Sequence, residues 1–271
     1  MTASDTPSSD RRIALVTGGT RGIGKAVAMR LAEDGLDVIV NFKSDAETAA
    51  ATVAELEACG VRAWAHAADI SDAKAIRGMF RWLKTEGPNR LDVLVHNAAF
   101  GTMAPLLRTG RYSWNATYET NVTAMLELGK AAHPFLKRQG GQIVGISSIG
   151  ASLVYSEYAS IGTSKAALEH LLRYMAFEWI GDGIRVNGLS MGPVETRAIE
   201  WFKHPEAVRN YASTKAPTNR IGMPSDAAGV VSFLCSSDSE WLVGQVLYAD
   251  GGISLGENFG HWMPSEDGDE G

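Results

Sequence analysis

Two side chains that could carry proton chemistry stand seven residues apart in the segment EYASIGTSKAAL, residues 157–168. Tyr158 offers a phenol and Lys165 an ammonium group, whereas Ile161, four residues before the lysine, has no proton to give. In a helix that begins near residue 158, seven residues advance by about 700°, so Tyr158 and Lys165 lie within about 20° on one face. Tyr158 is then one turn, roughly 5 Å, farther from the lysine than a group at position 161. The spacing predicts a phenol set back from the ammonium group.

A glycine-rich segment, TGGTRGIG, joins a short apolar run to a stretch with helical spacing. Glycines at such a turn let the backbone approach a pyrophosphate, and the helix N-terminus offers free N–H groups and a positive dipole end. We expect a dinucleotide site there, formed by Gly18, Thr20, Arg21, Gly22, Ile23 and Gly24.

The second predicted strand ends in VNFKS, which bears on the kind of dinucleotide. A cofactor without a 2′-phosphate is usually recognised by an acid near this point. Here Asn41 is neutral, Lys43 is basic, Ser44 follows it, and Arg21 lies in the preceding turn. A phosphate would meet cations and no repelling carboxylate, which favours NADPH over NADH. The alternative is that Lys43 and Arg21 are solvated surface charges.

Polar residues also follow the next two predicted strands. Asp69 and Ile70 end the third in AADIS, and Asn97 and Ala98 end the fourth in HNAA. Ligands of open α/β folds bind at the carboxyl edge of the sheet, so all four residues are expected at the cofactor. The Asp69 carboxylate could accept a hydrogen bond from an adenine amino group.

Strands and helices alternate along residues 12–255. Strands are predicted in RIALVTGG, DVIVNF, RAWAHAADI, LDVLVHNAA, GQIVGISS, IRVNGLS and GQVLYADGG. Helices are predicted between them, including one over about 112–138, one over 158–180, one over 197–215 and one over 225–237. This order predicts an α/β fold, a doubly wound, mostly parallel sheet with helices on both faces. One domain is expected over 12–255, after a disordered segment at 1–11 and before an acidic tail at 256–271.

Composition excludes several classes of function. The chain has 271 residues and a formal net charge of −6, and four of its acids lie in the final PSEDGDEG. This balance argues against nucleic acid or an anionic membrane as a partner. The start lacks an apolar signal region, no run is long enough to span a membrane, and Cys59, Cys235 and the histidines show no metal spacing. We expect a soluble, cytoplasmic protein without a metal.

The ordered motifs together resemble the short-chain dehydrogenase/reductase family over about residues 12–255. They are TGGTRGIG, AADI, HNAA, TNVTA, GISSIG, SKAALE, IRVNGLS and ADGG. The resemblance implies a single-domain Rossmann fold that assembles as a homotetramer or homodimer. It implies that Asn97 lies near the cofactor ribose, Asn121 near the active-site lysine, and Thr196 at the cofactor phosphates or amide. Ser148, seventeen residues before Lys165, stands where the family's catalytic serine stands.

Ile161 departs from the family, whose common ketone and alcohol enzymes carry tyrosine there. Tyr158–x6–Lys165 resembles instead the enoyl-acyl-carrier-protein reductases, and YASIGTSKAALEHLLRYMAFEW is similar to the active-site helix of their third bacterial type. Reduction of an enoyl thioester puts negative charge on the thioester oxygen, farther from the hydride path than a ketone oxygen. A set-back Tyr158 could donate to that oxygen, while Lys165 holds the nicotinamide ribose and lowers the pKa of the phenol. Tyr155 is the alternative donor.

The substrate side of the resemblance is a lid over about 196–220. Apolar contacts to an acyl chain are expected from Ile199, Trp201 and Phe202 of the lid, from Phe100 and Met103 opposite, and from Tyr155 and Tyr158. Basic lid residues, Arg209 and Arg220 among them, could meet an acidic acyl carrier protein or a coenzyme A phosphate.

We therefore expect an NADPH-dependent reductase of enoyl thioesters on acyl carrier protein or coenzyme A, in fatty-acid or specialised polyketide metabolism. Two alternatives stay open. One is a carbonyl (3-oxoacyl) reductase that uses Tyr158 or Tyr155. The other is a catalytically silent NADP(H)-binding regulator or scaffold.

Overall fold

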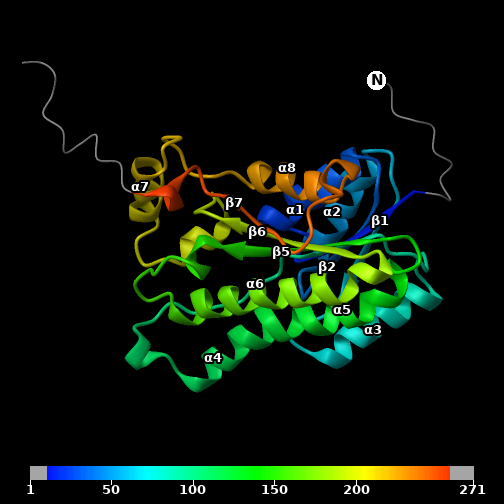
Figure 1. Cartoon of the computed structure of the whole chain (residues 1–271), viewed down its shortest axis with the longest axis horizontal. Coiled ribbons are helices and arrows are strands. Elements are labelled where there is room, and N and C mark those ends of the chain that lie inside the picture. Colours follow the sequence, from blue (N-terminus) through cyan, green and yellow to red (C-terminus); the bar gives the residue numbers. More distant parts are fainter. Residues whose placement is uncertain (1–10, 257–271) are drawn as a thin grey trace, which may run out of the picture.

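Seven parallel strands form one sheet in the order β3-β2-β1-β4-β5-β6-β7 in the computed structural model, which describes residues 11–256 (Figure 1). The expectations for residues 1–10 and 257–271 lie outside the described part. The strands are β1 (Ile13–Thr17), β2 (Asp37–Phe42), β3 (Ala63–Ala67), β4 (Val93–His96), β5 (Gln142–Ser148), β6 (Arg185–Met191) and β7 (Val246–Ala249). The predicted α/β fold with a parallel sheet is confirmed.

Helices cover both faces of this sheet. They are α1 (Gly22–Glu33), α2 (Ala46–Glu57), α3 (Ala73–Thr85), α4 (Arg111–Tyr118), α5 (Ala124–Leu136), α6 (Ala159–Trp179), α7 (Pro205–Lys215) and α8 (Pro224–Leu234). Helices α1, α2 and α8 lie on one face of the sheet and α3, α5 and α6 on the other (Figure 1). Side chains of each group of helices belong to a separate core. Neighbouring residues of β1 enter opposite cores, Leu15 the second and Val16 the first. Burial on both faces explains why the strands read as continuous apolar runs.

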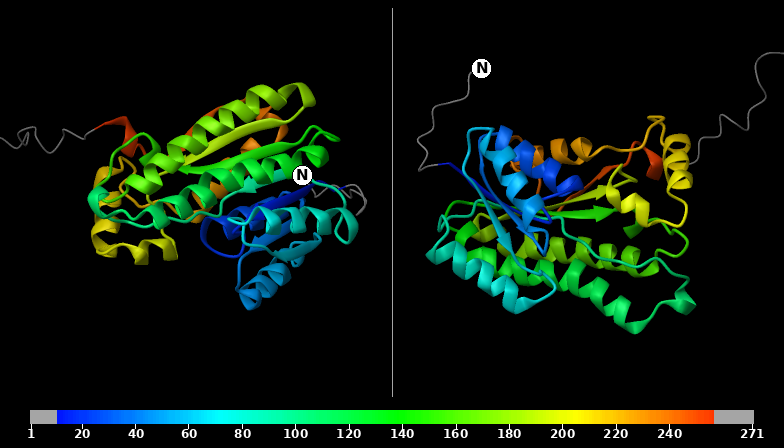
Figure 2. Two further views of the ribbon diagram at one scale, coloured as in Figure 1. Left: turned by 90° about the horizontal axis from the view of Figure 1, so that it is seen from below. Right: turned by 180° about the vertical axis from the view of Figure 1, so that it is seen from behind.

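The strand order reverses between β1 and β4, and this point places the site. In open α/β sheets a ligand crevice forms outside the carboxyl ends of the strands where the order reverses. The glycine-rich turn follows β1, and Asn97 follows β4. Helix α7 lies beyond the same carboxyl edge in the views of Figures 1 and 2.

Two predicted helices are interrupted. The one over 112–138 is α4, a π-helical turn η2 (Glu119–Thr123) and then α5. The one over 197–215 begins as the 3-10 segment η5 (Arg197–Trp201) and restarts as α7 at Pro205. The proline ring disfavours helical backbone at the preceding residue, and His204 has φ −135° and ψ 77°. Neither break is visible in hydrophobic spacing alone.

No helix within residues 11–256 is both long and apolar enough to cross a membrane.

Candidate active site

The glycine-rich turn between β1 and α1 has space only for glycine at its tightest point. A Cβ on Gly24 would lie 2.2 Å from the Gly18 carbonyl oxygen, and Gly18 and Gly22 have φ values of +61° and +52°. Thr20 is buried, Ile23 is half-buried, and Arg21 is exposed as the N-cap residue of α1. The turn therefore leaves its backbone and the start of α1 open to a pyrophosphate, as a dinucleotide requires.

Thr17 and Asn97 brace this turn. The Asn97 side-chain amide donates to the carbonyl oxygens of Thr17 at 2.9 Å and Gly18 at 3.2 Å. The Thr17 hydroxyl accepts from the backbone N–H groups of Asn97 at 3.0 Å and Ala98 at 3.1 Å. The structure thus assigns Asn97 a bracing role, and its contact with a ribose stays a prediction. Sequence reasoning missed Thr17, although a buried hydroxyl at a strand end is the signal that could have found it.

The residues expected at the adenine end of the cofactor differ in their exposure and in their bonding partners. Lys43 forms an ion pair with Asp69 at 2.6 Å, and both side chains are open to solvent. This pair joins the ends of β2 and β3, and with hydrogen bonds from Ser71 it lowers the pKa of Asp69. Asn41 is 2% exposed and its amide donates to the Ala68 carbonyl at 3.0 Å, so it supports the sheet. The remaining two expected residues are Ser44, which is exposed, and Ile70, which is buried.

Lys165 is held at the end of β5. Its Nζ donates to the Ile146 carbonyl oxygen at 2.7 Å, and the side chain is 6% exposed. Burial lowers the pKa of Lys165 to about 8, against the opposing charge of Glu169. An ammonium group with few fixed partners retains donors for a ligand.

Tyr158 is the N-cap residue of α6, with φ −104° and ψ 9°. The helix begins at Ala159, and the Gly162 N–H donates to the Tyr158 carbonyl oxygen at 2.8 Å, so the helix starts near residue 158 as expected, and the shared face with Lys165 stays a prediction. The phenol ring packs on the segment that follows β5. A Cβ on Gly150 would lie 2.6 Å from Tyr158 Cε1, so the ring lies against the Gly150 backbone. Gly150 was not singled out by sequence reasoning.

The Tyr158 hydroxyl points to Ser148. It donates to Ser148 Oγ at 3.5 Å, longer than a strong O–H···O bond and typical of a site without substrate. Burial raises the pKa of Tyr158, while the contact with Ser148 opposes that shift. The phenol is thus protonated and available as a donor, and the structure brings together Ser148, Tyr158 and the carbonyl that holds Lys165.

Ile161, one helical turn before Lys165 on α6, packs against a glycine. A Cβ on Gly101 would lie 2.2 Å from Ile161 Cγ1 and 2.7 Å from its Cδ1. The aliphatic side chain therefore packs on the loop that follows β4, and this position presents no proton donor.

Asn121 lies within η2 and is fully buried. Its amide donates to the Phe100 carbonyl and to Ser164 Oγ, both at 2.9 Å, and its Oδ1 accepts from the Phe100 N–H at 2.9 Å. The His96 imidazole contacts its backbone carbonyl at 3.3 Å. Asn121 thus joins the loop after β4, at Phe100, to α6 at Ser164, the residue that precedes Lys165.

That loop runs along the start of α6. Ser160 Oγ donates to the Thr102 carbonyl at 3.1 Å, and the Ala104 N–H donates to the Glu157 carbonyl at 3.0 Å. Phe100 is 41% exposed and Met103 is half-buried on the same loop. Their place beside the start of α6 fits the expected wall of an acyl site, and the contact itself stays a prediction.

The expected lid touches both halves of the site. A Cβ on Gly22 would lie 3.4 Å from Thr196 Cγ2, so the lid begins against the glycine-rich turn. From α7, Tyr211 meets Tyr155 edge to face at 6.4 Å between ring centroids, and Tyr155 meets Tyr158 at 6.2 Å. Burial raises the pKa of Tyr155, whose hydroxyl has no hydrogen-bond partner among the described residues.

The three apolar lid residues differ in exposure. Ile199 is buried, Trp201 is 70% exposed and Phe202 is half-buried. Arg209 on α7 bonds Glu195 at 2.8 Å, Glu200 at 2.5 Å and Glu206 at 2.6 Å, which ties the lid to itself. Arg220 is likewise paired with Asp226 at 2.7 Å. Both cations are thus paired within the chain, and their contact with an acyl carrier stays a prediction.

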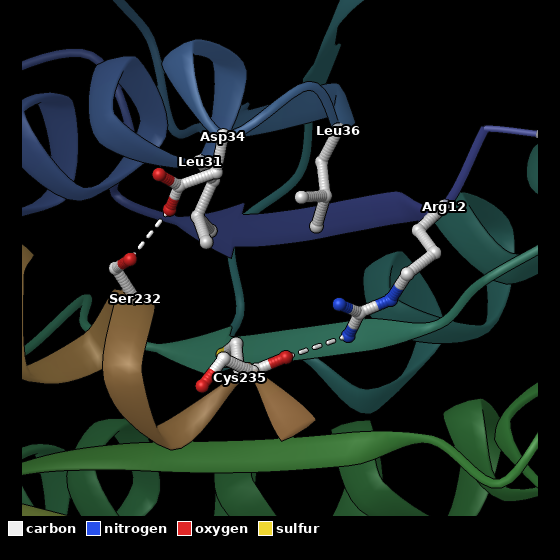
Figure 3. Close-up of a pocket in the computed structure, with 7 residues that line it drawn as sticks. Arg12, Leu31, Asp34, Leu36, Ser232 and Cys235 are labelled. Carbon is white, nitrogen blue, oxygen red and sulfur yellow. Dashed lines mark hydrogen bonds between the residues drawn. The ribbon is translucent and has the colours of Figure 1, made fainter. Parts of the chain in front are cut away.

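A separate cavity of about 150 Å³ lies at the amino edge of the sheet, between the start of β1 and the ends of α1 and α8 (Figure 3). There Ser232 Oγ donates to Asp34 at 2.5 Å, and Arg12 donates to the Cys235 carbonyl at 2.9 Å. Because Tyr158, Lys165 and the glycine-rich turn lie at the carboxyl edge, this cavity is not the active site. Residues 11–256 also contain no group of three or more acids, cysteines and histidines that could hold a metal.

Comparisons with known proteins agree with this geometry. The family model described as enoyl-(acyl carrier protein) reductase matches residues 18–254. The 1-cyclohexenylcarbonyl-CoA reductase of Streptomyces collinus is 34% identical over 251 residues, which cover 92% of this chain and 89% of that protein. The 3-oxoacyl-acyl-carrier-protein reductase of Staphylococcus aureus is 31% identical over 243 residues, covering 89% and 98%.

A solved short-chain dehydrogenase from Burkholderia cenocepacia, in complex with NADP, superposes with a TM-score of 0.83. It is 34% identical and covers 90% of this chain and 98% of its own. With the glycine-rich turn after β1 and the Ser148, Tyr158 and Lys165 set around β5, the chain belongs to the short-chain dehydrogenase/reductase family of nicotinamide-dependent oxidoreductases.

Proposed function

We propose that the protein is an NADPH-dependent reductase of the carbon–carbon double bond in enoyl thioesters carried by coenzyme A or acyl carrier protein. The observation that carries this proposal is the replacement of the usual phenol beside Lys165 by Ile161, with Tyr158 instead directed at Ser148. A phenol is retained in the site, but it approaches from the start of α6. The relative from Streptomyces collinus, named as a reductase of a cyclohexenylcarbonyl thioester, supports the same substrate class.

The chemistry follows from where charge develops. A bound nicotinamide cofactor would supply the hydride that the β-carbon of the enoyl group accepts. The electron pair of the double bond moves toward the thioester oxygen, which Tyr158 stabilises through its O–H group. The phenol proton points to Ser148 Oγ at 3.5 Å, and the thioester oxygen would replace Ser148 as its acceptor while Ser148 donates to the phenol oxygen. A proton then adds to the α-carbon and gives the saturated thioester.

Lys165 serves the cofactor side. The Ile146 carbonyl holds its Nζ at 2.7 Å and leaves the other N–H bonds for ribose hydroxyls. The glycine-rich turn receives the pyrophosphate, and Thr196 covers Gly22 from the lid. Lys43 and Arg21 favour NADPH, because the 2′-phosphate can draw the Lys43 ammonium group away from its exposed pair with Asp69.

A carbonyl reductase is the second candidate. The Tyr158 and Ser148 hydroxyls together form a pair of donors that could also hold a ketone oxygen. The 3-oxoacyl-acyl-carrier-protein reductase among the relatives supports this alternative.

One assay separates the two. Purified protein with NADPH is given crotonyl-CoA, cyclohexenylcarbonyl-CoA or acetoacetyl-CoA, and NADPH oxidation is followed at 340 nm together with the acyl product. We expect saturation of the enoyl substrates and slow or no reduction of acetoacetyl-CoA. Brisk reduction of acetoacetyl-CoA without enoyl turnover would establish the carbonyl reductase. Cofactor binding without turnover of any of them would indicate a silent binding protein.

A further inference from the structure

Glu169 is a buried acid that the proposed mechanism does not use. It lies on α6, one helical turn after Lys165, and is 5% exposed. Its carboxylate accepts a hydrogen bond from Ser147 Oγ at 2.7 Å, and Ser147 is 4% exposed. A buried carboxylate is costly unless it is bonded and faces an opposite charge, so this acid needs a reason.

Three consecutive residues of β5 each hold one functional group from α6 or its N-cap. The Ile146 carbonyl accepts from Lys165, the Ser147 hydroxyl donates to Glu169, and the Ser148 hydroxyl accepts from Tyr158. Ser147 thus sits between the anchor of the ammonium group and the partner of the phenol. A slip of the strand against the helix would disturb all three contacts together.

We propose that Glu169 is a positioning residue that docks α6 on β5 through Ser147 and supplies a negative charge one helical turn from Lys165 on the same face of α6. This role rests on the proposed use of Lys165 as a cofactor-binding cation. It requires no contact between Glu169 and substrate.

Among the titratable groups around Lys165, Glu169 is the one that can supply a negative charge to it. His96 on β4 is fully buried, and burial together with the positive charge of Lys165 lowers the pKa of His96 to about 3, so the ring is neutral. Tyr158 is protonated and bonded to Ser148. Arg173, which is 47% exposed, lies 3.9 Å from Glu169 and offsets part of its charge. Burial lowers the pKa of Lys165 to about 8, and Glu169 is the group that raises it.

The sign of the pH effect follows. Lys165 carries its charge below about pH 8 and loses it as the pH rises, so cofactor binding and turnover should fall on the alkaline side. Without the Glu169 charge, the lysine loses its proton at lower pH. When Arg173 no longer pairs with Glu169, Lys165 keeps its proton to higher pH.

The test compares three variants. Glu169→Gln keeps an oxygen that can accept from Ser147 but removes the charge, and we expect the alkaline midpoint to fall by about half a pH unit or more. Arg173→Met, at a partly exposed site that tolerates change, should move the midpoint upward. Ser147→Ala keeps the charge and loses the hydrogen bond, so it should lower activity with a midpoint near that of the parent.

Midpoints are read both from kcat with crotonyl-CoA and from NADPH binding followed by fluorescence, with melting temperatures recorded for each variant. A merely structural role would lower the melting temperature without moving any midpoint, and an unchanged midpoint in Glu169→Gln or in Arg173→Met overturns the proposal. If Glu169→Gln does not fold, Arg173→Met decides alone. Absence of enoyl turnover in the parent would defeat the proposed function only, because the binding midpoints still report on Glu169.

Discussion

At the scale of single residues, the site depends on which group stands beside Lys165. Ile161 packs on Gly101 at the position from which a phenol would serve a ketone, and Tyr158 approaches Ser148 from the N-cap of α6. Displacing the donor along the substrate suits charge that appears on a thioester oxygen, which is separated from the carbon that receives hydride. Under the proposed function, this exchange moves the donor from a ketone oxygen to the thioester oxygen.

Removing the Tyr158 hydroxyl should reveal its part in the reaction. We expect Tyr158→Phe to lower kcat with crotonyl-CoA by about 100-fold, the order for losing one oxyanion donor, with little change in the Kd for NADPH. Stopped assays and fluorescence titration measure the two quantities. Tyr174→Phe, on the same helix and 58% exposed, is the matched control. Full activity in Tyr158→Phe together with a loss in Tyr155→Phe would transfer the role to Tyr155.

At the scale of elements, the donor is placed by the packing of the segment after β5 on the start of α6. The Tyr158 ring lies against Gly150, and a Cβ on Gly162 would lie 2.6 Å from the Gly150 carbonyl oxygen. Two glycines thus let the segment and the helix approach closely enough for a ring to fit beside Ser148. The position of the phenol therefore depends on this contact as well as on the start of α6.

A methyl group at Gly150 should displace the phenol. Gly150→Ala would place a carbon 2.6 Å from Tyr158 Cε1, which forces the ring to move. We expect a loss of stability of roughly 1–3 kcal/mol and a fall in kcat that follows that of Tyr158→Phe, with NADPH still bound. Gly78→Ala, where no atom lies within 4 Å of the added carbon, is the control. Unaltered kcat in Gly150→Ala would show that the ring position does not matter.

At the scale of the whole molecule, the two halves of the sheet meet around the cofactor site. Asn97 after β4 braces the turn after β1, the expected lid begins against that turn at Thr196, and Tyr211 of α7 meets Tyr155 edge to face. A dinucleotide bound there would contact both halves and the lid at once. Binding should therefore stabilise the chain as a unit.

The cofactor-linked stability also tests the choice of NADPH. At about 100 times its Kd, NADPH should raise the melting temperature by roughly 5–10 °C, and by more than NADH at the same concentration. Lys43→Glu should abolish the difference, since it puts a negative charge where the 2′-phosphate is expected. Lys43→Gln, which removes the charge without repulsion, should lie between. Scanning fluorimetry measures all three, and an equal rise with both cofactors in the parent would contradict the assignment.

The sequence alone determined the alternation of strands and helices along the chain, the parallel sheet and the family, because apolar runs and glycine-rich turns are local signals. It also placed Tyr158, Lys165 and Ser148 as a set. It did not determine that helices 112–138 and 197–215 are interrupted, or that Thr17, Gly150 and Glu169 support the site. Those features depend on contacts between residues far apart in the chain, such as Thr17 with Asn97 and Ser147 with Glu169, whose closeness only the folded backbone creates.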